Sequence, residues 1–191
     1  TDQATFSYVL SLDADECLSP ELQNAILSVK SNCTSDAYSF SRLTNFCGTW
    51  IRHCGWYPDR RIRLWNKNKG RWGGENPHDK VIMNKGAVES FLKGDILHYS
   101  YDKLSDHIKQ VDNFSTIMAR EAFLKGKKPA FMLHVTLYPL FTFIKMYFFR
   151  LGLLDGAAGF MVCLNSAYYK YMKYAKLYHL HKSNATSSGL S

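Results

Sequence analysis

The first half of the chain carries short hydrophobic runs that are typical of β-strands. Residues 6–12 form an apolar run rich in aromatic and branched side chains, which predicts a strand. Apolar and polar residues alternate over 37–43 and again over 61–65, which predicts two half-buried strands. Shorter strands are predicted at about 81–83 and 87–91. This part of the chain is therefore expected to build a sheet.

Helix and loop signals separate these runs. Ser19 followed by Pro20 predicts a helix that begins with a serine N-cap and a proline in its first turn. The helix is expected to continue to about Lys30. The stretch 66–76 is polar and contains glycines, which predicts a loop with turns. The first half is thus predicted to be mixed α/β.

The pattern changes to helical spacing at about Asp102. Leu104, Ile108, Val111 and Phe114 recur every three to four residues, so we expect a helix that ends near Lys125-Gly126. A second apolar stretch, 130–149, is long enough to cross a membrane, but His134, Pro139 and Lys145 interrupt it.

We therefore expect 130–149 to form an interfacial or groove-lining helix. A further apolar helix is predicted over about 156–174, and it ends in a mixture of tyrosines and lysines that suits a lipid headgroup region. The alternative is that these helices pack on one another and on the sheet, since aromatic stripes at helical spacing are common in protein cores.

The length and composition favour an ordinary globular protein with a real core. The 191 residues are 46% hydrophobic and 21% charged, which argues against disordered and coiled-coil classes. The net charge of +8 favours anionic partners such as nucleic acid, anionic lipid or a nucleotide diphosphate. Five cysteines without a C-x-x-C pair indicate a reducing compartment rather than a zinc or disulfide framework.

The predicted elements suggest three segments: an α/β segment over 1–101, a helical and membrane-associating segment over 102–182, and a disordered tail over 183–191. The first predicted strand has no strand partner ahead of it in the sequence. We therefore expect that the N-terminal part of the α/β domain is missing.

Asp13 and Asp15 follow the first predicted strand directly and are the first candidates for chemistry. Two carboxylates in this position offer hard oxygen ligands for Mg²⁺ or Mn²⁺. The structural alternative is an exposed acidic turn that favours the next helix N-terminus. A haloacid dehalogenase phosphatase also places an Asp after a strand, but its motif requires Thr where this chain has Cys17.

Three further segments carry chemistry. Cations and aromatic residues are interleaved over 52–65, where they could grip a diphosphate, line a sugar site or bind single-stranded nucleic acid. Glu75, His78 and Asp79 bring two carboxylates and an imidazole into one loop, where a carboxylate could act as a base. His98 ends an apolar run and could complete a metal site. Each of these has a plain alternative as a surface contact or a satisfied, partly buried side chain.

Taken in order, these segments resemble glycosyltransferase family 2, and within it the bacterial lipopolysaccharide core enzymes. The matching segments, which span most of the chain, are 9–16, 52–59 with Arg63-Leu64, His78-Asp79, 97–101, and 152–156 with Gly159-Phe160. The resemblance implies a GT-A-like, Rossmann-related mixed sheet that is N-terminally truncated and followed by amphipathic or apolar C-terminal helices. It also implies an inverting transferase for hexosyl or heptosyl groups.

The resemblance assigns a role to each candidate residue. Asp13, Asp15 and Arg63 are expected to bind the nucleotide-sugar donor, and Asp15 and His98 a divalent cation, Mg²⁺ or Mn²⁺. Asp79 is the expected base, with Glu75 as the substitute because the family's usual His-Glu is His78-Asp79 here. Two aromatic residues are expected to contact the acceptor: Trp56 and Tyr57.

The expected acceptor is a saccharide or a lipid-linked sugar of the bacterial cell envelope. The expected location is the cytoplasmic face of the inner membrane, with peripheral attachment and without nucleic acid. The fragment by itself is expected to be inactive. The alternative function is a non-catalytic basic module that binds anionic membrane or nucleic acid, with steep salt dependence and indifference to Asp15.

Overall fold

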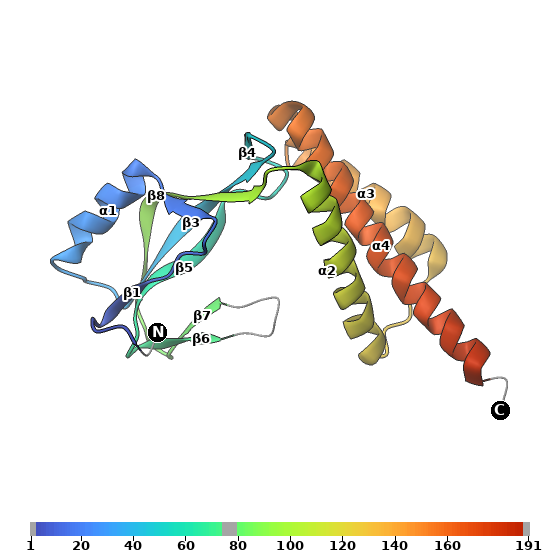
Figure 1. Ribbon diagram of the computed structural model, residues 1–191, viewed down its shortest axis with the longest axis horizontal. Helices are drawn as coiled ribbons and strands as arrows, with labels where there is room; N and C mark the ends of the chain where they lie inside the picture. The colour runs from blue at the N-terminus through green and yellow to red at the C-terminus, as the bar shows by residue number, and fades with distance from the viewer. Residues whose placement is uncertain (1–2, 74–79, 189–191) are drawn as a thin grey trace. The chain divides into compact units, whose positions relative to one another are not determined.

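The computed structural model describes residues 3–73 and 80–188, and it divides the chain into two compact units (Figure 1). The first unit contains residues 1–45 and 56–100, and the second contains residues 46–55 and 101–191. The short segment 46–55 therefore belongs with the C-terminal helices, although it is flanked in the sequence by strands of the first unit.

The first unit is built around a sheet with the strand order β1-β5-β3-β8-β2. The pairs β1/β5, β3/β5 and β2/β8 are antiparallel. A separate antiparallel ribbon is formed by β6 and β7. The elements are β1 (Tyr8–Leu10), β2 (Glu16–Leu18), α1 (Pro20–Lys30), β3 (Ala37–Phe46), β5 (Asp59–Asn66), β6 (Gly70–Gly73), β7 (Lys80–Met83) and β8 (Glu89–Tyr101).

The core of the first unit lies between α1 and the sheet. Leu22 on α1 is fully buried against Tyr38 and Phe40 of β3, Leu64 of β5 and Ile96 of β8. Ser19 begins α1 as predicted, because its hydroxyl oxygen accepts a hydrogen bond from the backbone N–H of Leu22 at 3.2 Å. Leu22, with Ile26 and Val29 packed against the same cluster, thus anchors the helix over three strands.

The structure corrects several predicted boundaries and exposures. Strand β3 is not half-buried: nearly every residue in it is buried, because β5 and β8 flank it. The stretch 66–76 is not only a loop, since it contains β6. Of the strand predicted over 6–12, only the three residues of β1 form a strand. Strand β8 is much longer than the strand predicted at 87–91.

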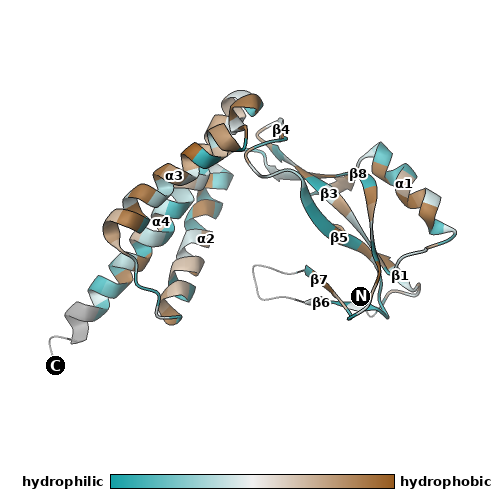
Figure 2. Ribbon diagram, turned by 180° about the vertical axis from the view of Figure 1, so that it is seen from behind, coloured by the Kyte–Doolittle hydropathy of each residue, from teal (hydrophilic) through white to brown (hydrophobic). Residues whose placement is uncertain are grey.

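The second unit is helical apart from β4 (Thr49–Ile51). Its helices are α2 (Leu104–Leu124), η1 (Phe131–Leu137), α3 (Tyr138–Ile144), η2 (Lys145–Phe149), η3 (Gly152–Asp155) and α4 (Gly156–Ser188). Hydrophobic residues recur along the η1–α3–η2 segment and the first turns of α4 (Figure 2). The widened π-turns of η1 and η2 flank α3, which has Pro139 in its first turn.

The core of the second unit forms where α2 packs on α4. Ala119 and Ala122 of α2 are buried against Leu177 of α4. Helix α4 is longer than the predicted 156–174, and it continues to Ser188 into the segment whose composition predicts a disordered tail. Together, the two units confirm the predicted mixed α/β class with C-terminal helices and are consistent with a GT-A-like fold.

Candidate functional site

The turn between β1 and β2 places the acidic residues predicted for donor binding. The backbone N–H of Glu16 donates to the carbonyl of Asp13 at 3.0 Å. The backbone N–H of Asp13 donates in return to the Glu16 carboxylate at 3.1 Å. These two bonds close the turn that carries Asp13 and Asp15.

Glu16 is the buried anchor of this turn, and the sequence analysis missed its role. Its side chain is 0% exposed, and Arg63 of β5, itself 7% exposed, donates from Nη2 to Glu16 Oε1 at 3.0 Å. The same Nη2 donates to Asp13 Oδ2 at 2.7 Å. Arg42 Nη1 of β3 lies 3.6 Å from Glu16 Oε1. A carboxylate can be buried only when charges and hydrogen bonds compensate for lost water, which these arginines provide.

The role predicted for Arg63 differs from the contacts that the structure gives it. Its guanidinium is occupied by two carboxylates of the protein, whereas the sequence analysis expected it to bind the donor. The hydrogen bond from Arg63 holds the pKa of Asp13 below its ordinary value, against the smaller effect of burial. Arg63 therefore orients Asp13, and any contact with a donor stays a prediction.

Asp15 and His98, the two predicted metal ligands, lie side by side. Strand β2 pairs with β8 so that Glu16 is opposite His98, and the backbone N–H of Tyr99 donates to the carbonyl of Asp15 at 2.9 Å. Asp15 Oδ2 is 3.1 Å from His98 Nε2. The hydroxyl of Ser100 lies 2.6 Å from His98 Nδ1. Both imidazole nitrogens thus have a partner.

The electrostatics of His98 favour its neutral form, which is the form that binds metals. Its side chain is 15% exposed, and burial lowers the pKa of His98. Arg42 lowers this pKa further, while the carboxylates of Asp15 and Glu16 act in the opposite direction. Burial outweighs the attraction to Asp15.

Two side chains could coordinate a cation at this place. Asp15 is about half exposed, and its carboxylate and the His98 imidazole are a chemically suitable pair for Mn²⁺ or Mg²⁺. Within 3–73 and 80–188 there is no group of three or more His, Cys, Asp or Glu side chains that could hold a metal. A cation at this place would need further ligands from water or from phosphate oxygens.

The predicted acceptor residues lie on the connection that leads into β5. The hydroxyl of Tyr57 donates to Asp95 Oδ1 at 3.0 Å, and the backbone N–H of Asp95 donates to the hydroxyl of Ser19 at 3.1 Å. Trp56 is partly exposed. Tyr57 is thus tied to the start of α1 through Asp95, and sugar binding by the two aromatic residues stays a prediction.

A cationic pocket of about 260 Å³ opens on the first unit beside these strands. Arg60 and Arg61, which fall outside the family resemblance, line it together with Arg63, Trp72 and Lys80. The Arg63 guanidinium lies 5.8 Å from the centre of the Trp72 ring. Trp72 is not among the residues predicted for the site, because the composition of 66–76 predicts a loop.

Two predicted catalytic residues lie outside the described part of the chain. Asp79, the expected base, and Glu75, its substitute, both fall in 74–79 together with His78. The site described for Asp13, Asp15 and His98 therefore does not include them.

Residues 52–55, which belong to the segment predicted to bind a diphosphate, lie in the second unit. The carboxylate of Asp155 accepts the backbone N–H of His53 at 2.8 Å, and its Oδ1 lies 2.8 Å from His53 Nδ1. Cys54 Sγ is buried 3.5 Å from Cys163 Sγ on α4. These contacts join the 46–55 segment to the start of α4, which is a structural role.

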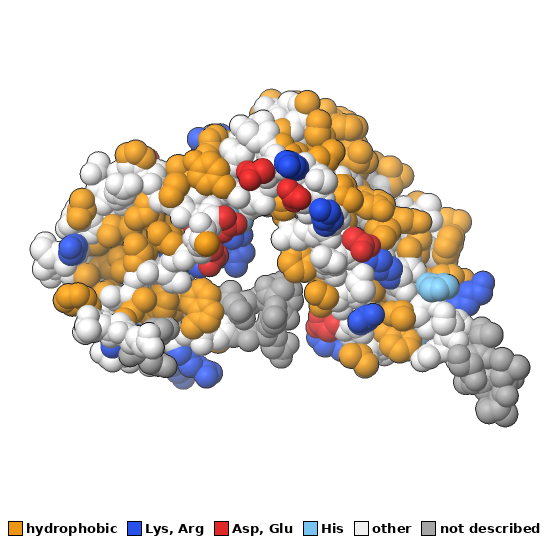
Figure 3. Space-filling view, in the orientation of Figure 1, with side chains coloured by type: hydrophobic (Ala, Val, Ile, Leu, Met, Phe, Trp, Pro, Cys, Tyr) orange, Lys and Arg blue, Asp and Glu red, His pale blue; other side chains and the backbone are white. Residues whose placement is uncertain are grey.

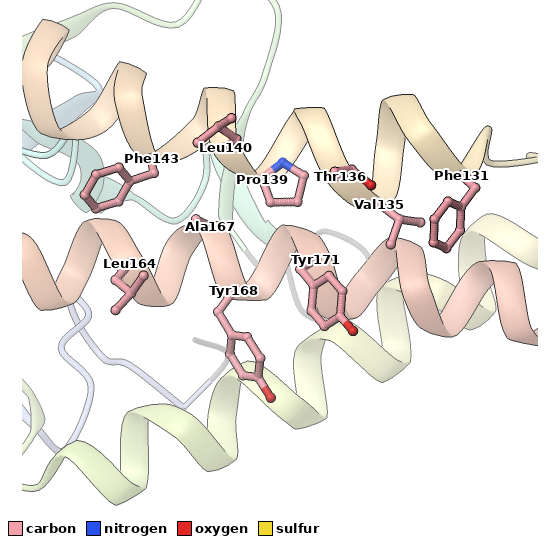
Figure 4. A pocket seen from close by; sticks show the side chains of 10 residues that line it. All are labelled: Phe131, Val135, Thr136, Pro139, Leu140, Phe143, Leu164, Ala167, Tyr168 and Tyr171. Atoms are coloured by element: carbon pink, nitrogen blue, oxygen red, sulfur yellow. The ribbon is translucent and has the colours of Figure 1, made fainter.

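The second unit also has an apolar pocket of about 570 Å³ between η1, α3 and α4 (Figure 4). Its lining side chains are Phe131, Val135, Thr136, Pro139, Leu140, Phe143, Leu164, Ala167, Tyr168 and Tyr171. Residues 131–149 form a helical segment that is apolar and long enough to cross a membrane, and 6% of it is buried. Hydrophobic side chains cover much of the visible surface along α3 and α4 (Figure 3).

Comparison with known proteins gives a consistent set of relatives. The chain is 26% identical over 190 residues to the lipopolysaccharide core biosynthesis glycosyltransferase LpsC of Rhizobium meliloti, covering 96% of this chain and 68% of the relative. It is 28% identical over 185 residues to an uncharacterized glycosyltransferase of Rickettsia typhi, covering 91% and 62%.

A third relative is an uncharacterized glycosyltransferase of Rickettsia prowazekii, which is 27% identical over 181 residues, or 89% of this chain and 61% of the relative. The chain thus spans about two thirds of the length of these curated relatives. No family model and no solved structure matches it.

Proposed function

We propose, on the premise that this chain is a homologue of bacterial glycosyltransferases, that it is the metal-binding part of an enzyme that transfers a sugar during lipopolysaccharide core or related cell-envelope synthesis. One observation supports this site most directly. Asp15 and His98, which lie far apart in the sequence, are 3.1 Å apart beside the turn that carries Asp13. The proposed donor is a nucleotide sugar, and the proposed class is family 2.

In this proposal Asp15 and His98 hold Mg²⁺ or Mn²⁺. When bound, the cation would offset negative charge on the nucleoside diphosphate leaving group. Asp13 faces the donor, and Arg63 and Glu16 fix its position through the bonds described above. Preorganised charge is effective because it needs no rearrangement during the reaction.

The proposed reaction inverts the anomeric carbon. The acceptor hydroxyl oxygen forms a bond to this carbon, the bond from the carbon to the diphosphate oxygen breaks, and the hydroxyl proton passes to a carboxylate. Asp79 is the proposed base, with Glu75 as the substitute. The transferred group is proposed to be a hexosyl or heptosyl unit.

The proposed acceptor is a saccharide or lipid-linked sugar, contacted by Trp56 and Tyr57. A lipid-linked acceptor requires contact with the membrane, and the exposed apolar face of the second unit supports peripheral attachment. Leu140 and Phe141 on α3 are 56% and 57% exposed. Large apolar patches of this kind commonly mark interaction surfaces. We place the protein on the cytoplasmic face of the inner membrane.

Calorimetry with a panel of nucleotide sugars tests the donor site. We expect binding in Mn²⁺ and little binding in chelator, measured on this chain. Asp15→Asn should abolish the metal-dependent binding, and His98→Gln should weaken it. Asp102→Asn is the matched control, because Asp102 is an exposed carboxylate outside the site. Binding that ignores both metal and Asp15 would contradict the proposal.

Sugar transfer tests the base separately from the donor site. In a form of the enzyme that transfers sugar, we expect Asp79→Asn to retain donor binding and to lose most of its transfer. If Glu75 is the base instead, Glu75→Gln should lose most of its transfer and Asp79→Asn should keep it. If both variants transfer normally, the base is elsewhere. If no form binds a nucleotide while all bind anionic vesicles or nucleic acid, the alternative of a non-catalytic basic module takes its place.

A further inference from the structure

The positive charge of this chain is concentrated at its C-terminal end. Residues 125–191 contain nine lysines and arginines and one acidic residue, Asp155. Their formal charge of +8 equals the net charge of the whole chain, so the residues before them are neutral overall. Concentrated charge of one sign draws counter-ions to a surface.

Part of this charge converges on a pocket of about 320 Å³ in the second unit. We call it the lysine pocket, because three lysines line it: Lys127 and Lys128 after α2 and Lys173 on α4. His134 of η1, Tyr174 and Pro129 also line it. The three lysines come from segments about forty-five residues apart, so the fold and not the sequence brings them together.

The lysine pocket lacks negative charge of its own. Among the described residues, no carboxylate forms an ion pair with Lys127, Lys128 or Lys173, whereas Glu121 is paired with Lys125. Burial and the nearby charges of Lys170 and Lys127 lower the pKa of Lys173, and Glu121 opposes this only in part. Like charges held together in this way are relieved when an anion binds.

The pocket wall is ordered by backbone hydrogen bonds. The N–H of Lys127 donates to the carbonyl of Ala122 at 3.0 Å, and the carbonyl of Lys127 accepts from His181 Nε2 of α4 at 3.0 Å. Gly126, at φ +69°, makes the turn that ends α2. The backbone at Lys127 is therefore held between the end of α2 and α4.

A purely structural role does not explain the whole cluster. Lysines that follow a helix C-terminus interact favourably with its dipole, which accounts for Lys127 and Lys128 at the end of α2. Lys173 lies well inside α4, far from either of its ends. Its ammonium group lies 5.6 Å from the centre of the Tyr174 ring, a contact that does not require the other two lysines nearby.

We propose that the lysine pocket binds a phosphate group, as a monoester or a diphosphate, at a site separate from the Asp15–His98 pair. Lysines bind phosphate as point charges, and the pocket volume is sufficient for such a group with part of its ester. The phosphate is carried either by a lipid headgroup or by a soluble phosphate ester. This site does not depend on the proposed transferase reaction.

Vesicle binding by the full chain tests the proposal. Vesicles of phosphatidylcholine alone are compared with vesicles that also contain phosphatidic acid, whose headgroup is a phosphate monoester. We expect phosphatidic acid to strengthen binding by the wild type. The affinity for phosphatidic acid vesicles should fall about fivefold in Lys173→Gln. It should fall more than about tenfold in the combined Lys127→Gln, Lys128→Gln and Lys173→Gln variant. Circular dichroism and the urea midpoint verify that each variant is folded.

A charge-matched control separates this pocket from general electrostatics. Lys103→Gln with Lys109→Gln removes exposed lysines from the same unit, and we expect it to keep the phosphatidic acid effect. An equal loss in this control and in a double variant of the pocket, Lys127→Gln with Lys173→Gln, would overturn the proposal. So would equal binding by wild type and the triple variant.

Pyrophosphate distinguishes the two sources of phosphate. If it binds the free chain in calorimetry and this binding needs Lys173, the site accepts soluble phosphate groups. If only phosphatidic acid vesicles show the lysine dependence, the ligand is a lipid headgroup. Both results support the site, whereas lysine-independent binding in both assays contradicts it. Failure of nucleotide-sugar binding would leave these outcomes unchanged.

Discussion

At the scale of single residues, the first unit depends on a buried network of charges. Glu16, with no exposed side-chain surface, accepts from Arg63 and lies near Arg42. Breaking a buried ion pair by removing one charge is costly, because the remaining charge is left without compensation. The network therefore has two consequences: it stabilises the first unit, and it holds Asp13 in place.

We expect Glu16→Gln to lower the free energy of unfolding by about 3 kcal/mol, because it leaves the buried Arg63 with Asp13 as its carboxylate partner. Urea denaturation at neutral pH measures this. Glu21→Gln is the control, since the Glu21–Lys93 pair is exposed on both sides and should contribute less than about 0.5 kcal/mol. Equal losses in the two variants would show that the burial of Glu16 does not matter.

His107 makes the stability of the second unit depend on pH. It is buried at the start of α2, where Asn165 Nδ2 lies 2.9 Å from its Nδ1 and the centre of the Tyr101 ring lies 4.5 Å from that of its imidazole, with the rings tilted by 44°. Burial lowers the pKa of His107 from 6.5 to about 4. The unfolded chain therefore binds a proton more readily than the folded chain between these values. Its contribution to stability is complete above pH 6.5 and is lost as the pH falls towards 4.

Between pH 7 and pH 4.5 we expect the wild type to lose up to about 3 kcal/mol from this group. His107→Gln cannot titrate, so its loss over the same range should be smaller by that amount. Urea denaturation at the two pH values gives the difference. His179→Gln, at an exposed position on α4, should follow the wild type. If His107→Gln and the wild type lose the same free energy of unfolding between pH 7 and pH 4.5, His107 is not the group responsible.

At the scale of elements, short contacts fix where helices begin and how closely they pack. Ser19 caps α1 and also accepts the backbone N–H of Asp95, so one hydroxyl joins the helix start to β8. In the second unit, a Cβ on Gly159 would lie 2.0 Å from the carbonyl oxygen of Gly152. Only glycine permits this approach of α4 to η3.

We expect Ser19→Ala to destabilise the chain by about 1 to 2 kcal/mol, because two backbone N–H groups lose their acceptor. Thermal or urea unfolding measures the effect. Ser28→Ala provides the comparison on the same helix, since the hydroxyl of Ser28 is exposed and bonds only to the preceding turn at the carbonyl of Ala25. A Ser19→Ala variant as stable as Ser28→Ala would show that water replaces the cap.

At the scale of the whole molecule, the chain combines a unit that carries the acidic pair with a unit that carries the apolar face and the excess positive charge. Helix-forming segments with a large exposed apolar face and nearby lysines are suited to a membrane interface. The apolar pocket of Figure 4 lies within this face, between η1, α3 and α4. This supports our proposal that the second unit meets the membrane.

The combined variant Leu140→Ser and Phe141→Ser tests this face. Both side chains are exposed, so we expect almost unchanged stability and binding to anionic vesicles at least about tenfold weaker, measured by co-sedimentation. Leu27→Ser is the matched control, since Leu27 is 62% exposed on α1 of the first unit. If both variants bind as the wild type does, the apolar face does not enter the membrane.

Signals between neighbouring residues are enough to predict the local features. The N-cap and proline that begin α1 and the helical spacing of α2 are such signals, and the structure confirms both elements. The strand predicted over 61–65 is confirmed as β5, but it is not half-buried, because Arg63, Leu64 and Trp65 are all buried. The Asp13–Asp15 motif was visible for the same reason, because both carboxylates follow one strand.

Which distant residues meet depends on the folded chain and not on local signals. The burial of Glu16, the contact of Asp15 with His98 and the meeting of Lys127 with Lys173 all depend on strand register or helix packing. Segment 46–55 joins the helical unit because Asp155 binds the backbone of His53, a contact across about a hundred residues. A pattern of hydrophobic and polar positions specifies which face of an element is buried, but it does not specify the partner that covers that face.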